Sequence, residues 1–131
     1  MLYTIIRERG MIIMRTITKY LAFDDNEFNN EKDCHDYEQF IWDNLMRFIR
    51  NYELCDGKGR PLSIPPMAEI EDLLPEFEAA ANACEEINIH EEMEPTDPAY
   101  CWVYNYCGFY FPREKGRWRY NWHNHDWVKI G

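Results

Sequence analysis

The middle of the chain lacks positive charge. No Lys or Arg occurs between Arg60 and Arg113, whereas eleven carboxylates fall in that window. The part up to Arg60 has nine basic and eleven acidic side chains, and the part from Arg113 onward has five basic and two acidic ones. The formal charge of -10 therefore comes mainly from one stretch, which favours recognition of a positively charged partner. It disfavours direct nucleic-acid binding, because Lys and Arg supply most of the affinity for phosphates.

Several signatures of function are also missing. No apolar run approaches the roughly 20 residues of a membrane-spanning helix, so we expect a cytoplasmic protein without membrane contact. The five cysteines never form Cys-x-x-Cys, which argues against a disulfide framework or zinc ribbon. No glycine-rich phosphate loop, serine elbow or paired-histidine metalloprotease motif occurs. The sequence therefore predicts a non-enzymatic protein with no cofactor.

The first half of the sequence predicts a hairpin followed by a long helix. Residues 12–23 are rich in β-formers, Asp24-Asp25-Asn26 is typical of a tight turn, and Glu27-Phe28 provides a short return strand. Asn29 or Asn30 is suited to cap a helix that ends near Leu54. Its apolar face steps by three and four, through Cys34, Tyr37, Ile41, Leu45, Phe48 and Tyr52, widened by Phe40, Trp42 and Ile49.

The second half predicts a broken acidic helix and an aromatic hairpin. A helix from about Pro66 carries apolar residues at helical spacing, and Pro75 is expected to kink or split it; the apolar set is Ile70, Leu73, Leu74, Phe77, Ala80, Ala81 and Cys84. Residues 85–90 suit a short strand. Residues 98–107 suit a short helix or a strand, with Asp97 as the helix cap and Gly108 at its end. Residues 117–122 and 127–130 form the C-terminal hairpin.

These elements predict an α+β fold. A small antiparallel sheet, built from the N-terminal hairpin and the C-terminal aromatic hairpin, packs against the long amphipathic helix and the broken acidic helix. Residues 14–131 are expected to form a single α+β domain, since the sequence shows no internal repeat and no second domain.

One motif gives a resemblance. The residues are Tyr20-Leu21-Ala22-Phe23-Asp24, Glu27-Phe28, Glu31, Cys34 and Tyr37-Glu38. With them the first quarter of the chain resembles short phage and prophage proteins that begin with a Y-x-A-x-D-G-x-E-F hairpin and continue with an E-x-x-C-x-x-Y-E helix. Asp25-Asn26 replaces the usual Asp-Gly turn. The resemblance implies a mobile-element origin and not a mechanism.

The carboxylates suggest a binding surface. Residues four apart on a helix rise about 6 Å, near the spacing of phosphates along a DNA strand. We therefore expect an acidic, DNA-mimicking surface that inhibits a nucleic-acid-handling defence protein of the host, of the anti-CRISPR or anti-restriction type. The residues expected to bind this partner are Glu69, Asp72, Glu76, Glu85 and Glu86. The alternative is an acidic face that only keeps the protein soluble.

The aromatic tail allows three interpretations. Residues 100–127 hold eleven aromatic side chains, which could form only core, a surface for protein partners or homo-oligomers, or a nucleotide pocket. In the last case the protein would sequester a nucleotide signal, with Arg117, Trp118, Arg119 and Tyr120 as its ligand-binding residues. A further alternative is a small metal-dependent enzyme that uses His123, His125 and Asp126, although a hairpin turn explains these residues better.

The N-terminus yields a first prediction. Arg7-Glu8-Arg9-Gly10 can be encoded by a purine-rich run directly before Met11, as a ribosome-binding site would be. Residues 1–13 are therefore expected to be a non-native or disordered extension, with translation starting at Met11 or Met14. Mass spectrometry of the natively expressed protein tests this, and an intact N-terminus at Met1 would remove the idea.

Overall fold

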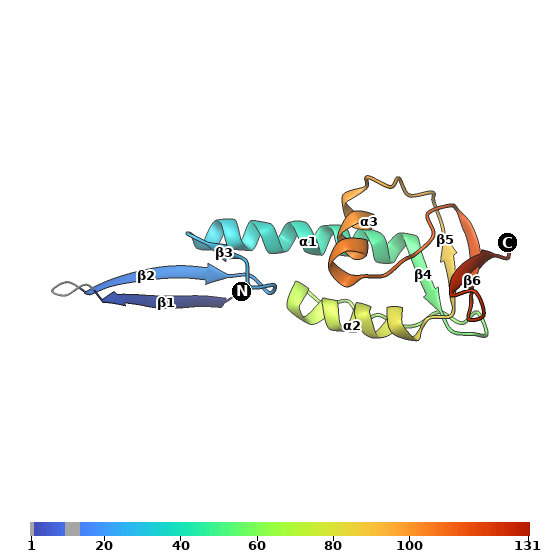
Figure 1. Cartoon of the computed structure of the whole chain (residues 1–131), viewed down its shortest axis with the longest axis horizontal. Helices are drawn as coiled ribbons and strands as arrows, with labels where there is room; N and C mark the ends of the chain where they lie inside the picture. The colour runs from blue at the N-terminus through green and yellow to red at the C-terminus, as the bar shows by residue number, and fades with distance from the viewer. Residues whose placement is uncertain (1, 10–13) are drawn as a thin grey trace. The chain divides into compact units, whose positions relative to one another are not determined.

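The computed structural model describes residues 2–9 and 14–131, with side chains from residue 19 onward. Its helices and antiparallel sheets make an α+β fold, as predicted (Figure 1). The backbone contacts divide the chain into unit 1, Met1–Trp42, and unit 2, Asp43–Gly131. The single domain expected over residues 14–131 stays a prediction.

Unit 1 contains a three-stranded sheet of order β1-β2-β3. Strand β1 (Leu2–Arg9) pairs with β2 (Met14–Leu21), which pairs with β3 (Glu27–Phe28). The predicted hairpin around Asp24 is thus confirmed. The extension predicted over residues 1–13 includes β1, whereas residues 1 and 10–13, Met11 among them, lie outside the described residues. The translation start stays a prediction.

The motif that carries the resemblance, between Tyr20 and Glu38, connects the hairpin to the start of helix α1 (Glu31–Asn51) by hydrogen bonds. The Tyr37 hydroxyl donates a short hydrogen bond to the Asp24 carboxylate, and the Phe23 amide donates to the buried Glu38 carboxylate at 3.1 Å. Asn30 caps α1 as predicted, since its Oδ1 accepts from the Asp33 amide at 2.8 Å. The residues behind the resemblance therefore have local structural roles.

Unit 2 contains a separate four-stranded sheet of order β4-β5-β6-β7. The strands are β4 (Tyr52–Cys55), β5 (Glu86–Ile89), β6 (Gly116–Asn121) and β7 (Asp126–Lys129). The prediction that both terminal hairpins share one sheet is wrong for the described strands. The C-terminal hairpin pairs instead with β5, where Ile87 lies opposite Trp118.

Helix α1 ends at Asn51, earlier than the predicted end near Leu54. Tyr52 fits a helical spacing after Phe48, but it also begins β4, where Tyr52 and Leu54 pair with Ile89 and Ile87. Pairing with a distant strand thus determines the boundary. Of the residues expected to widen the apolar face, Phe40 is 58% exposed.

Helix α2 (Ile70–Ala83) starts later than predicted and runs through Pro75 as one helix (Figure 1). Pro75 was expected to kink or split this helix, and it does not split it. Pro75 is exposed and removes only the amide that would bond to the Glu71 carbonyl, which water can satisfy at an exposed position. The whole predicted apolar set of α2 is buried, from Ile70 to Cys84.

The segment before β6 is helical, which decides between the two predicted alternatives. Helix α3 (Pro98–Trp102) continues into the π-helix η1 (Val103–Cys107). The Asp97 side chain accepts from the Ala99 amide at 2.9 Å, and Gly108 ends η1 with a φ of 77°. Both predicted end signals are confirmed.

A proline-containing segment runs beside β4. The Leu62 amide donates to the Leu54 carbonyl at 2.8 Å, and Pro61 forms an isolated bridge with Cys55. The turn before it is closed by Asp56, whose Oδ1 accepts from the Lys58 and Arg60 amides. This segment therefore lies along the edge of the sheet.

The core of unit 2 centres on stacked aromatic rings. Phe48 and Tyr52 stack with ring centroids 4.0 Å apart, Phe77 meets Phe48 edge-on at 5.8 Å, and Phe111 lies 5.8 Å from Phe48. The Tyr52 hydroxyl donates to the Pro112 carbonyl at 2.6 Å. Rings from α1, β4, α2 and the segment before β6 thus meet at one place.

This packing gives a stability prediction. Phe77 is fully buried, so Phe77→Ala is expected to lower the free energy of unfolding by about 3–5 kcal/mol. Phe40→Ala removes the same atoms from an exposed site and is expected to cost well under half as much. Denaturant unfolding of both variants tests this, and equal losses would contradict the core position of Phe77.

Candidate functional site

Helix α2 displays carboxylates along one edge of its exposed surface. Glu69 is the N-cap residue, and Asp72 and Glu76 follow at spacings of three and seven, which keeps all three within about 60° around the helix axis. Glu69 and Asp72 are exposed and Glu76 is half-buried. Among the side chains of residues 19–131, no Lys, Arg or His forms an ion pair with any of the three. Their charge is available to a partner.

A second carboxylate row lies on the other side of that surface. Glu71 and Glu78 are seven apart and share a direction about 100–180° from the residues of the first row. Between the two rows the helix exposes Pro75, Ala79 and Asn82, none of them charged. The solvent face of α2 is therefore a shallow ridge between two lines of negative charge.

Glu85 and Glu86 do not extend this surface. The helix ends at Ala83, and both residues lie beyond it. Glu85 is half-buried and packs against the turn that follows β4. A Cβ added at Gly57 of that turn would lie 2.3 Å from the Glu85 Oε2. Glu86 is 4% exposed, and its two carboxylate oxygens lie 3.7 Å and 3.5 Å from the guanidinium groups of Arg117 and Arg119. Its charge is compensated within the chain.

The four residues predicted to bind a nucleotide do not form one site. Strand β6 alternates, so Arg117 and Arg119 lie on the face of Glu86, whereas Trp118 and Tyr120 lie on the opposite face. The Trp118 indole donates to the Glu114 carbonyl at 3.0 Å, and Tyr120 packs against Trp127 with ring centroids 5.3 Å apart. An open cleft of about 420 Å³ does bring Arg119 and Tyr120 together, beside Trp122, but Arg117 and Trp118 do not line it.

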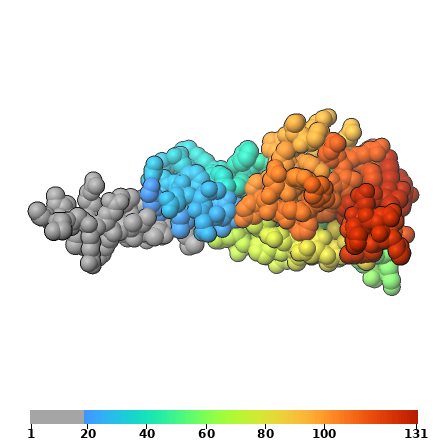
Figure 2. Space-filling model, in the orientation of Figure 1, coloured from blue at the N-terminus to red at the C-terminus, as the bar shows by residue number. Residues whose placement is uncertain are grey.

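An open cleft of about 470 Å³ lies instead on the aromatic side of the hairpin. Its walls come from the end of α2, from residues 108–111 and from the β6–β7 hairpin, which lies at the surface of unit 2 (red in Figure 2). Six of the lining residues are aromatic: Phe109, Tyr110, Phe111, Tyr120, Trp122 and Trp127. Aromatic density was the sequence signal for this site, but its location required the fold.

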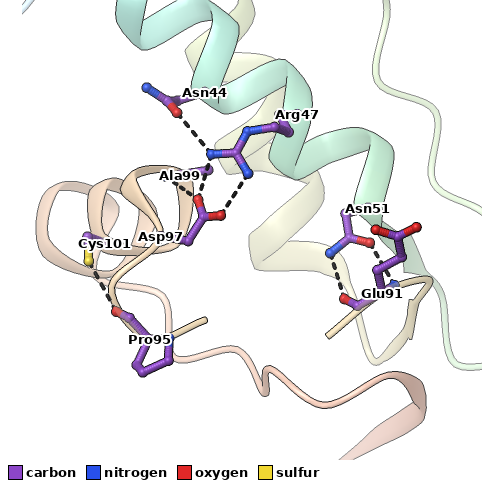
Figure 3. Close-up of polar contacts among 8 residues, drawn as sticks. All are labelled: Asn44, Arg47, Asn51, Glu91, Pro95, Asp97, Ala99 and Cys101. Atoms are coloured by element: carbon purple, nitrogen blue, oxygen red, sulfur yellow. Dashed lines mark hydrogen bonds and ion pairs between the residues drawn. The ribbon is translucent and has the colours of Figure 1, made fainter. Parts of the chain in front are cut away.

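A second, polar cleft of about 370 Å³ is lined by residues of α1 and of the loop after β5. The Arg47 guanidinium donates two hydrogen bonds, of 2.8 and 2.6 Å, to the Asp97 carboxylate. The Asn51 side chain donates to the Glu91 carbonyl and accepts from the Glu91 amide (Figure 3). Hydrogen bonding from Arg47 lowers the pKa of Asp97. These side chains are engaged in holding the loop to α1, so the cleft is chiefly structural.

The described residues contain no group of three His, Cys, Asp or Glu side chains that could hold a metal ion. His123, His125 and Asp126 lie exposed in or beside the β6–β7 turn, where Asn121 Oδ1 accepts from the His123 amide at 2.9 Å and His125 has a φ of 52°. They lie where the sequence predicted a hairpin turn.

Three of the five thiols are poor nucleophiles. Burial raises the pKa of Cys84, at the aromatic cleft, to about 12 and that of Cys107 to about 12. Burial also raises the pKa of Cys55 to about 11. These cysteines are therefore protonated at neutral pH, and reactivity requires the thiolate.

No protein-family model, curated protein or solved structure matches the chain. None of the helices in the described part of the chain is long and apolar enough to cross a membrane. The fold and its surfaces therefore carry the functional argument.

The environment of Glu86 gives a prediction. Glu86→Gln keeps the shape but removes the anion between two guanidinium groups, so we expect a loss of about 1 kcal/mol in the free energy of unfolding, reduced at high salt. Glu91→Gln removes an equal charge from an exposed position and should change stability by less than about 0.5 kcal/mol. Urea unfolding at two salt concentrations measures both. A more stable Glu86→Gln protein would mean that desolvation of the carboxylate outweighs its attraction to the arginines.

Proposed function

We propose that the protein is a non-enzymatic phage or prophage accessory protein that binds a basic surface of another protein through helix α2. The observation that carries the proposal is the row Glu69, Asp72 and Glu76, which faces solvent without an ion-pair partner in the described residues. An ordinary solvated helix interleaves both signs of charge, whereas α2 contains none of the positive sign.

The partner that suits this surface is a host defence protein that handles nucleic acid. Such a protein has a Lys- and Arg-rich groove for phosphates. Asp72 and Glu76 rise about 6 Å along the helix, a spacing similar to that of phosphates on one strand. Occupying the groove would exclude DNA or RNA from it, so binding and inhibition have the same cause.

The shape of the α2 surface is consistent with such docking. Pro75 and Ala79 keep the ridge between the carboxylate rows low, so a partner's backbone could approach the helix closely while its cations reach either row. Glu85 and Glu86 are left out of the proposed surface, because one packs against a turn and the other is paired with Arg117 and Arg119.

The proposal predicts the effect of charge reversal. The triple variant Glu69→Lys, Asp72→Lys, Glu76→Lys should weaken partner binding on the order of a hundredfold, because attraction becomes repulsion at three positions. The three positions are not buried, so the fold should be retained. The matched control is Glu91→Lys, Glu92→Lys, Glu94→Lys, which makes the same charge change on three exposed loop residues.

The measurement is a pull-down from nuclease-treated host lysate, followed by titration of the purified partner. The wild-type chain and the control should retain one nucleic-acid-binding protein that the α2 variant loses. Added DNA or RNA should compete with the wild-type chain for it, and affinity should fall with rising salt. Equal binding by all three proteins, or binding that nucleic acid does not affect, would refute the proposal.

A further inference from the structure

The aromatic cleft of unit 2 is built before any ligand arrives. The Trp127 indole donates to the Tyr110 carbonyl at 2.9 Å, which ties the hairpin to the segment before it. The Tyr110 hydroxyl forms a short hydrogen bond with that of Tyr104. Two walls of the cleft are thus held together, and a preorganised site loses less entropy when it binds.

The rings of the hairpin stand at steep angles to one another. Tyr120 makes an interplanar angle of 74° with Trp122 and of 73° with Trp127, at centroid distances of 4.7 and 5.3 Å. A planar base is held best between parallel faces, whereas a rounded group is held by faces that meet at large angles. Trp122 lines the cleft and is 64% exposed, so much of its surface is uncovered.

The charge of the lining selects the sign of the ligand. Among the described residues no Lys or Arg lines the cleft, so no such side chain is present to neutralise a phosphate. Asp126 does line it, and one of its oxygens accepts from the Trp127 amide at 2.8 Å while no ion pair engages it in the described residues. His125 is the other titratable group of the hairpin at the cleft and lies exposed.

We propose that this cleft binds a small organic cation with a methylated ammonium headgroup. The faces of Trp and Tyr rings are negative and attract such a cation, and its methyl groups make it cheaper to desolvate than a bare ammonium. The Asp126 carboxylate adds attraction from the rim. A volume of about 470 Å³ is within the range of small-molecule sites and leaves room for a body larger than the headgroup.

This inference goes beyond the proposed function and does not depend on it. None of Glu69, Asp72 and Glu76 lines the cleft, and none of the cleft's aromatic residues lies on the solvent face of α2. The triple charge-reversal variant of α2 should therefore bind the cation as the wild-type chain does. Failure of one proposal leaves the other standing.

The test is a titration of the full chain with choline, followed by NMR of the indole N–H resonances of its five tryptophans. Trp122 and Trp127 are assigned with Trp→Phe variants. Choline should shift these two resonances saturably. The neutral isostere, in which carbon replaces the nitrogen of choline, should bind about tenfold more weakly, because the rings attract the charge. AMP serves as the anionic, planar comparison.

Variants locate the site. Trp122→Ala should weaken choline binding about tenfold, whereas Trp122→Phe keeps an aromatic face and most of the affinity. Asp126→Asn should weaken it about threefold. Tyr106→Ala, which removes a 46% exposed ring outside the cleft lining, should leave it unchanged. The proposal is overturned if choline produces no saturable shift, if the isostere or AMP binds as well as choline, or if Tyr106→Ala weakens binding as much as Trp122→Ala.

Discussion

The stacked rings of Phe48 and Tyr52 are the constraint on which unit 2 depends. Tyr52 is the first residue after α1 and the first residue of β4, so its ring lies in the core at the point where helix becomes strand. Its hydroxyl also holds the Pro112 carbonyl, which positions the segment that carries Phe109 and Phe111. The same segment forms a wall of the aromatic cleft. The core and that surface site thus share one anchor.

Local chemistry made much of the fold predictable. The helix ends could be inferred from the sequence, because each capping residue contacts backbone groups only a few positions away. These residues are Asn30, Asp97 and Gly108. Strand β4 could not be inferred from the sequence. Tyr52 fits both a helical and an alternating pattern, and its pairing partner, Ile89, is distant in sequence. The separation into two sheets has the same cause, since it depends on β5 pairing with β6. Pro75 was misjudged because exposure makes its missing amide tolerable.

The binding surfaces were less predictable, because the composition gives the number of charged side chains but not which of them are paired or buried. Glu69 and Glu86 look alike in the sequence, yet one faces solvent and the other lies beneath Arg117 and Arg119. The aromatic cleft combines three segments, and the hairpin contributes Trp122 and Trp127 from two sides of its turn. Aromatic abundance indicated an interaction site, but only the strand register shows that Trp118 and Tyr120 lie on the face of β6 opposite Arg117 and Arg119.

The segment beside β4 has a consequence for behaviour at high concentration. The free edge of a sheet can recruit a strand from another molecule and so begin aggregation. Here the Leu62 amide donates a hydrogen bond to the Leu54 carbonyl. Pro61, which has no amide hydrogen, lies opposite Cys55. Growth of the sheet from this side is blocked by the chain itself. The segment beside β4 thereby helps to keep an aromatic-rich protein from aggregating with its own copies.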